Sequence, residues 1–180
     1  MNPSSSASLP AVPSLVGAAQ HSRFFQRLQR RYGDDLGLLP AGEPSLATMA
    51  LAWEALRARG HDTGTALRIL RQLVMARLVQ LDCEDQAPLK VVTRAVTELG
   101  EFALDQACQQ ARHDLDERHG APLGADGQPV PLWIIGMGKF GARELNVSSD
   151  IDLIYVYAED GETAGNAEGR NRISNHEYFG

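Results

Sequence analysis

The chain has 180 residues, a formal net charge of −6 and two cysteines. A chain of this length can bury a sizeable core, whereas its acidic balance excludes a general nucleic-acid binder, which would carry a basic stripe. It has no apolar run of about 18 residues, so we expect no membrane span. The scattered cysteines, Cys83 and Cys108, are typical of reduced thiols in a cytoplasmic protein.

The first two thirds of the chain predict a tail followed by helices. Residues 1–15 are rich in Ser, Pro and Ala and lack the basic start of a signal peptide, so we expect a disordered tail. Residues 16–119 repeat apolar side chains at three- and four-residue spacing, which predicts an α-helical region. Its helices are expected at 16–32, 45–59, 63–81 and 88–118, with glycines as stop signals.

The apolar stripes of these helices define an expected core. On the last helix the stripe is expected to continue into the C-terminal half through Ala107 and Ala111. We expect the helices to pack mainly through large side chains at helical spacing, namely Leu46, Trp53, Leu70, Leu73, Leu99 and Phe102.

The composition changes after the helical region. Residues 120–131 hold three glycines and three prolines and predict a linker. An apolar strand at 132–135 then runs into the turn GMGKFG, and a second apolar strand opens with Asp150-Ile151-Asp152. The sequence SNHE at 174–177 is a capping box that announces a helix. Because the chain stops three residues later, we expect it to be a fragment.

The strongest candidates for chemistry are Asp150 and Asp152. Side chains two apart on a strand point to the same face, so these carboxylates are expected side by side, with Ile151 opposite. Carboxylates next to a phosphate-sized turn suit Mg²⁺ and a nucleotide, because Mg²⁺ bridges carboxylate and phosphate oxygens. The alternative is two solvated acids at the start of a strand.

The glycine turn supplies further candidate residues for nucleotide binding. Gly136, Gly138 and Gly141 could let the backbone approach phosphate at a helix N-terminus, or could simply permit a tight turn. Lys139 could neutralise phosphate charge or be a solvated lysine. Ser149 could donate a hydrogen bond to phosphate or to the second aspartate, or could cap the strand entry.

The same turn also fits G-x-G-x-x-G, the fingerprint of dinucleotide-binding oxidoreductases. Only nine residues, 142–150, separate Gly141 from Ile151. A crossover between parallel strands normally needs about a dozen residues or more, including a helix. This interpretation is therefore the weaker one, and a full helix between the two strands would restore it.

Gly138, eleven intervening residues, Asp150, one residue and Asp152 resemble the signature of polymerase-β-type nucleotidyltransferases. The longer string GMGKFGARELNVSSDIDLIYVY resembles the glutamine synthetase adenylyltransferase family, from Pro131 to the C-terminus. The resemblance implies an α+β fold in which the helical region precedes the start of a polymerase-β-like nucleotidyltransferase domain, truncated here and incomplete at 132–180. It also implies a third carboxylate on a later strand, so the fragment alone is expected to be inactive.

What the resemblance implies for function is regulation of glutamine synthetase by AMP on a tyrosine. The position of the motif resembles the adenylyl-removing half, in which phosphate releases ADP; the alternative is the transferase half, which consumes ATP. The cofactor implied is Mg²⁺, with Asp150 and Asp152 as ligands. Implied partners are glutamine synthetase and a PII-type signal protein. The remaining alternative is a non-catalytic interaction module.

Overall fold

The computed structural model describes residues 17–180, so the expected tail at 1–15 and the expected helix start at Val16 lie outside it. The helical region contains the short 3₁₀ helices η1 (Ala18–His21) and η2 (Leu36–Leu38) and the α-helices α1 (Arg23–Tyr32), α2 (Leu46–Ala58), α3 (Thr63–Asp85) and α4 (Leu89–His119). The remaining elements are β1 (Pro122–Leu123), β2 (Leu132–Gly136), α5 (Gly138–Gly141), β3 (Leu153–Tyr157), β4 (Glu162–Thr163) and α6 (Asn175–Phe179).

Side-chain caps explain where the helices begin. Ser22 accepts a hydrogen bond from the Phe25 amide, so α1 starts at Arg23 and the expected helix 16–32 is broken there. Ser45 forms a capping box with Thr48. Asp62 accepts hydrogen bonds from Thr65 that lower the pKa of its carboxyl group. Each cap satisfies a backbone amide that has no partner within the helix.

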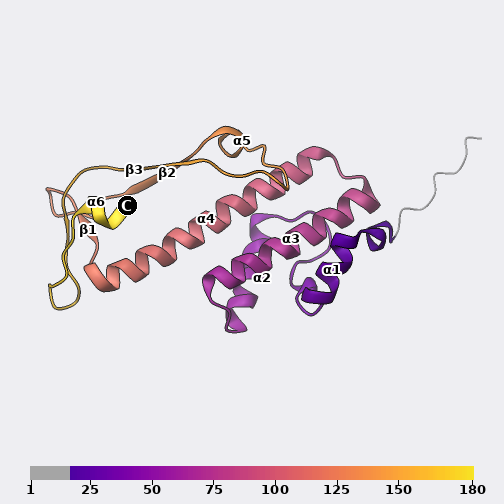
Figure 1. Cartoon of the computed structure of the whole chain (residues 1–180), viewed down its shortest axis with the longest axis horizontal. Helices are drawn as coiled ribbons and strands as arrows, with labels where there is room; N and C mark the ends of the chain where they lie inside the picture. Colours follow the sequence, from indigo (N-terminus) through magenta and orange to yellow (C-terminus); the bar gives the residue numbers. More distant parts are fainter. Residues whose placement is uncertain (1–16) are drawn as a thin grey trace, which may run out of the picture.

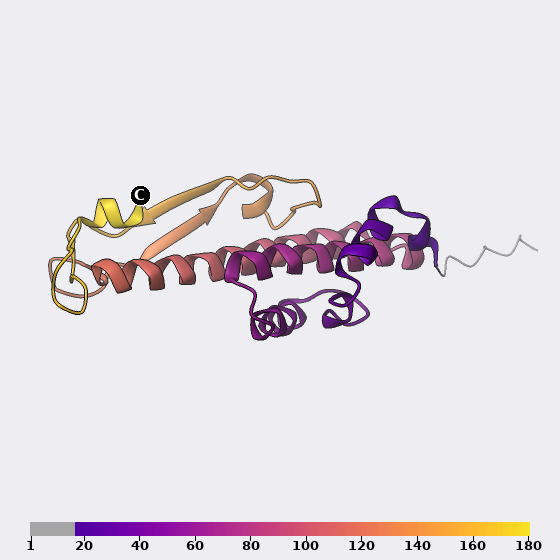
Figure 2. The ribbon, with the colours of Figure 1, turned by 60° about the horizontal axis from the view of Figure 1, so that its bottom comes forward.

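Helices α3 and α4 form a long hairpin, and the other elements lie along its sides (Figure 1). The β2–β3 ribbon lies along one side of α4, and α2 lies on the other side of the helical hairpin (Figure 2). Helix α3 extends to Asp85 and ends where Gln86 adopts a left-handed conformation with φ of 48°. Helix α3 is thus four residues longer than the expected helix 63–81, since residues 82–85 are also helical.

The helical core partly matches the expected stripes. Leu70 and Leu73 are fully buried, and Trp53 packs edge-on against Phe102 with ring centroids 5.9 Å apart. Leu46 is 44% exposed, contrary to expectation, because it lies in the first turn of α2, at the margin of the bundle.

The expected stripe on α4 also ends early. Ala107 and Ala111 are exposed, because α4 continues past the bundle formed by α1, α2 and α3 (Figure 1). The C-terminal half of α4 instead has the β2–β3 ribbon beside it (Figure 2). No helix between residues 17 and 180 combines the length and apolar character that crossing a membrane requires.

Both small sheets are antiparallel pairs. Strand β2 pairs with β3 from Leu132 opposite Tyr157 to Gly136 opposite Leu153. Strand β1 pairs with β4 and lies inside the segment 120–131 that we expected to be a linker. This second pairing is possible because Gly120 and Gly165 approach closely: a Cβ on Gly120 would lie 2.1 Å from the Gly165 carbonyl oxygen.

The end of the glycine turn belongs to the helical core. Phe140 and Leu145 are buried in the same hydrophobic cluster as the side chains of α3 and α4. Part of the segment 132–180, namely Phe140, Leu145 and Leu153, therefore packs into the core of the helical region across the expected boundary at 120–131. This shared core fixes the segment that follows α5 against α4.

Candidate functional site

The glycine turn and the two aspartates meet at one end of the β2–β3 ribbon. The Met137 amide donates a hydrogen bond to the Asp152 carbonyl oxygen at 2.9 Å, one step beyond the pair of Gly136 and Leu153. Both carboxylates are exposed and border one pocket. The other residues that line it are Met137, Lys139, Asn146, Ser148 and Ser149.

Strand β3 begins later than the sequence predicts. We expected it to open with Asp150, whereas the regular strand starts at Leu153. The ladder cannot extend further because β2 ends at Gly136 and the chain turns into α5 directly afterwards. The aspartates consequently sit on an irregular segment held by one backbone hydrogen bond to the turn, not on the rigid strand that we expected.

Asn146 organises the turn before Asp150. Its side-chain oxygen accepts hydrogen bonds from the Ser148 amide at 3.1 Å and from the Ser149 hydroxyl at 3.0 Å. The backbone amide of Asn146 donates a hydrogen bond to the Ser149 hydroxyl at 3.2 Å. The Ser149 hydroxyl therefore closes this turn and does not bond Asp152. An Asn followed by serines at this spacing is a recognisable turn signal, although its position in a candidate site was not evident from sequence.

The three glycines of the turn differ in surroundings. A Cβ on Gly136 would lie 2.7 Å from the Phe140 ring, and one on Gly141 would lie 2.4 Å from the Gly136 carbonyl oxygen. Gly138 has open space but a φ of 52°. Helix α5 has only four residues, so it does not provide the helix N-terminus that we expected to face phosphate. Tight packing accounts for Gly136 and Gly141.

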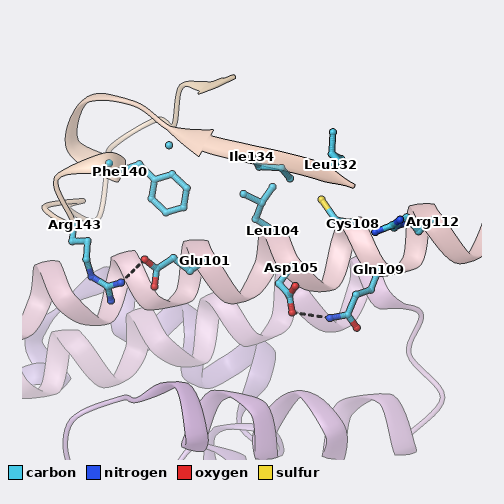
Figure 3. Close-up of a pocket in the computed structure, with 12 residues that line it drawn as sticks. Glu101, Leu104, Asp105, Cys108, Gln109, Arg112, Leu132, Ile134, Phe140 and Arg143 are labelled. Carbon is cyan, nitrogen blue, oxygen red and sulfur yellow. Dashed lines mark hydrogen bonds and ion pairs between the residues drawn. The ribbon is translucent and has the colours of Figure 1, made fainter. Parts of the chain in front are cut away.

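Gly136 and Gly141 line a different cavity, between α4 and β2 (Figure 3). On its α4 side, Glu101 accepts a hydrogen bond from Arg143 at 2.6 Å, and Asp105 accepts one from Gln109 at 2.7 Å. Partial burial, with the Asp105 carboxylate nearby, raises the pKa of the Cys108 thiol. A thiol with a raised pKa stays protonated, which makes Cys108 a poor nucleophile.

The donor atoms of the aspartate pocket match a hard cation. Two carboxylates and nearby hydroxyl and amide oxygens are ligands that Mg²⁺ accepts, and Mg²⁺ commonly uses one or two carboxylates while keeping several waters. Lys139 also lines this pocket and adds a positive charge to it. Among residues 17–180, no group of three or more His, Cys, Asp or Glu side chains could hold a metal.

The topology contradicts the dinucleotide-binding alternative. Strands β2 and β3 are antiparallel, whereas a dinucleotide fold requires parallel strands joined by a crossover helix. The segment between them contains only the four-residue α5. The G-x-G-x-x-G pattern here is therefore a tight turn between antiparallel strands.

The chain matches the family described as glutamate-ammonia ligase adenylyltransferase over residues 18–180. Its relatives include proteins named "Bifunctional glutamine synthetase adenylyltransferase/adenylyl-removing enzyme". The one from Chromobacterium violaceum is 50% identical over 71% of this chain and 14% of its own length. That from Ralstonia nicotianae is 40% identical over 94% of this chain and 19% of its own length.

A third relative with this name, from Aromatoleum aromaticum, is 40% identical over 92% of this chain and 18% of its own length. The chain thus spans less than a fifth of the length of these relatives. The family match includes the helical region as well as the turn and the aspartate pocket. On this basis, the chain belongs to the glutamate-ammonia ligase adenylyltransferase family.

Proposed function

We propose that this chain forms part of a Mg²⁺-dependent nucleotidyltransferase site that removes AMP from a tyrosine of glutamine synthetase. The observation that carries the proposal is the pocket in which Asp150, Asp152 and Lys139 converge from two segments of the chain. The names of the relatives include both the adding and the removing activity. We assign the removing one because the motif resembles that half.

The reaction proposed is a phosphorolysis. An oxygen of inorganic phosphate forms a bond to the adenylyl phosphorus, and the bond from that phosphorus to the tyrosyl oxygen breaks. The products are ADP and tyrosine, whose oxygen takes up a proton. In-line transfer of this kind depends on positioning and on neutralising the charge of the phosphate oxygens.

Each residue of the pocket has a defined role in this proposal. Asp150 and Asp152 would hold the cation. When bound, the cation would neutralise negative charge on the phosphate group that is transferred. Lys139, which lines the same pocket, would bind a phosphate oxygen. The Asn146 turn would keep Asp150 next to the glycine turn, since its hydrogen bonds hold the residues directly before that aspartate.

The experiment compares Asp152→Asn with wild type in the full-length protein that contains this chain. The assay follows ADP formation from phosphate and adenylylated glutamine synthetase. Asparagine keeps the size of the side chain and removes a charge that holds the cation. Because metal stabilisation is worth several kcal/mol and 1.36 kcal/mol is tenfold in rate, we expect a loss of about 100-fold or more. Asp34→Asn, at an exposed position after α1, is the matched control.

The outcomes separate the alternatives. Near-normal ADP formation by Asp152→Asn would contradict a catalytic site here and favour the interaction module. Loss confined to the ATP-consuming addition of AMP would assign the chain to the transferase half. Loss of both reactions in the Asp34→Asn control would show that the assay reports overall charge and not the site.

A further inference from the structure

One turn of α4 holds the segment that leads to the aspartates. The carboxylate loop, residues 142–152, connects α5 to β3. Thr97, Gly100 and Glu101 are spaced at i, i+3 and i+4 on α4 and therefore share one face. Glu101 bonds Arg143 and Thr97 bonds Leu145 of the loop, and a Cβ on Gly100 would also meet Leu145. The loop is thus fixed to the helical region about five residues before Asp150.

The contacts of this face differ in how firmly they hold the loop. In the Arg143–Glu101 ion pair Arg143 is solvent-exposed and Glu101 is partly exposed, and pairs accessible to water contribute little. Gly100 leaves room for neighbours: a Cβ there would lie 3.4 Å from Leu145 Cδ1. The contact of Thr97 is buried. Its hydroxyl accepts a hydrogen bond from the Leu145 amide at 3.2 Å.

Because this hydrogen bond is buried, the Leu145 amide depends on the Thr97 hydroxyl as its acceptor. Thr97 is 0% exposed and Leu145 is 3% exposed, so water cannot replace the hydroxyl. A buried amide that loses its acceptor keeps the full cost of desolvation, unlike an exposed one. The hydrophobic core holds the Leu145 side chain, and Thr97, 48 positions earlier in the chain, holds its backbone amide.

The connection continues from Leu145 to the pocket. Asn146 follows directly, and its side chain binds Ser148 and Ser149 in the closed turn described above. That turn ends at Asp150, and its residues line the same pocket as both carboxylates. A displacement of Leu145 would move this turn as a unit, because its internal hydrogen bonds do not involve α4.

We propose that Thr97 is a positioning residue for the cation site at Asp150 and Asp152, acting through the Leu145 amide and the Asn146 turn. The inference rests on the proposed function for the identity of the site. It makes α4 a structural part of that site, although α4 supplies none of the side chains that line the pocket.

The test measures Mn²⁺ binding to the 180-residue chain, with Mn²⁺ as a paramagnetic probe of the Mg²⁺ site. Amide NMR signals near Asp150 and Asp152 should broaden as Mn²⁺ is added, and Asp152→Asn should abolish that broadening. Thr97→Val removes the hydroxyl while keeping the shape. It should raise the Mn²⁺ concentration for half-maximal broadening by about tenfold, the lower end of what loss of a direct hydrogen-bond partner of a metal ligand causes, because Thr97 acts through Leu145.

Two variants serve as matched comparisons. Thr97→Ser restores the hydroxyl and should return the half-maximal concentration to within about twofold of wild type, in line with a hydrogen-bond role. Thr93→Val makes the same chemical change one turn earlier on α4, where the threonine hydroxyl bonds the Lys90 carbonyl instead of the loop. It should leave Mn²⁺ binding unchanged.

The outcomes distinguish this inference from the proposed function. If wild type shows no broadening near the aspartates, the cation site itself is wrong. If wild type binds Mn²⁺ and Thr97→Val binds equally well, the positioning role is refuted while the site stands. Hydrogen exchange of the Leu145 amide in wild type is an independent measurement: protection supports the inference, and rapid exchange overturns it even if the valine variant does not fold.

Discussion

Phe140 joins the glycine turn to the helical bundle, and its removal should destabilise the fold. The side chain is 8% exposed and belongs to the hydrophobic cluster of α3 and α4. Its ring occupies the space that Cβ atoms on Gly136 and Gly100 would need, at 2.7 and 3.2 Å. Both glycines therefore make room for this ring, and Phe140→Ala would leave the space between them empty.

The expected size of the effect follows from the surroundings of the ring. Phe→Ala in a closed core costs about 3–5 kcal/mol, depending on how far the cavity can collapse. Phe140 also lines the cavity between α4 and β2, so part of the vacated space is open to solvent (Figure 3). We therefore expect the lower end, about 3 kcal/mol. For a chain of this size that corresponds to a fall in Tm of about 6–12 °C.

Urea unfolding of the 180-residue chain, followed by circular dichroism, measures this loss. The matched control is Phe24→Ala, because Phe24 lies on α1 and is 36% exposed. It should cost less than about 1 kcal/mol, as for other substitutions of partly exposed residues. A loss below about 1 kcal/mol for Phe140→Ala would contradict a shared core of the turn and the bundle.

Two further predictions concern the turn and the cap of α3. Gly141→Ala should destabilise the chain by about 1–3 kcal/mol in the same unfolding assay, because its Cβ would lie 2.4 Å from a backbone oxygen. Gly37→Ala, which meets open space, should not; equal effects would refute the packing argument. The Asp62 pKa is lowered on folding by hydrogen bonds from Thr65, so the stability it contributes is present above the unfolded pKa of 3.8 and lost as pH falls through the lower folded value. The difference in Tm between wild type and Asp62→Asn should shrink in that acid range, and a constant difference would contradict the cap.

The local sequence determined the helices and the ribbon. Ser22, Ser45 and Asp62 lie at helix starts because their side chains bond amides three residues ahead, an interaction that needs no distant partner. The short polar segment after GMGKFG likewise argued against a crossover helix, and the observed antiparallel strands rule one out between β2 and β3. The late start of β3 was not predicted, because strand ends depend on where the partner strand stops.

Burial at the margins of the bundle was decided by tertiary structure. Leu46 and Ala107 fit the helical periodicity as well as the buried Leu73 does, yet both are exposed. Periodicity fixes which face of a helix is apolar, but it does not say how far the neighbouring helices extend along that face. Phe140 and Leu145, at 8% and 3% exposure, were not recognised as core residues for another reason: they lie in the short connection between β2 and β3, where no helical or strand periodicity marks a buried face.

The candidate site also has features that the local sequence encodes and features that only the tertiary structure decides. Its residue types, two carboxylates beside a lysine and a glycine turn, are encoded within the short segment 136–152, so the proposed chemistry is a prediction of the sequence by itself. How that segment is held was decided only by the fold, because the hydrogen bond from the Leu145 amide to Thr97 joins residues 48 positions apart. No local pattern marks such a threonine: its partner is a backbone amide, which every residue except proline possesses.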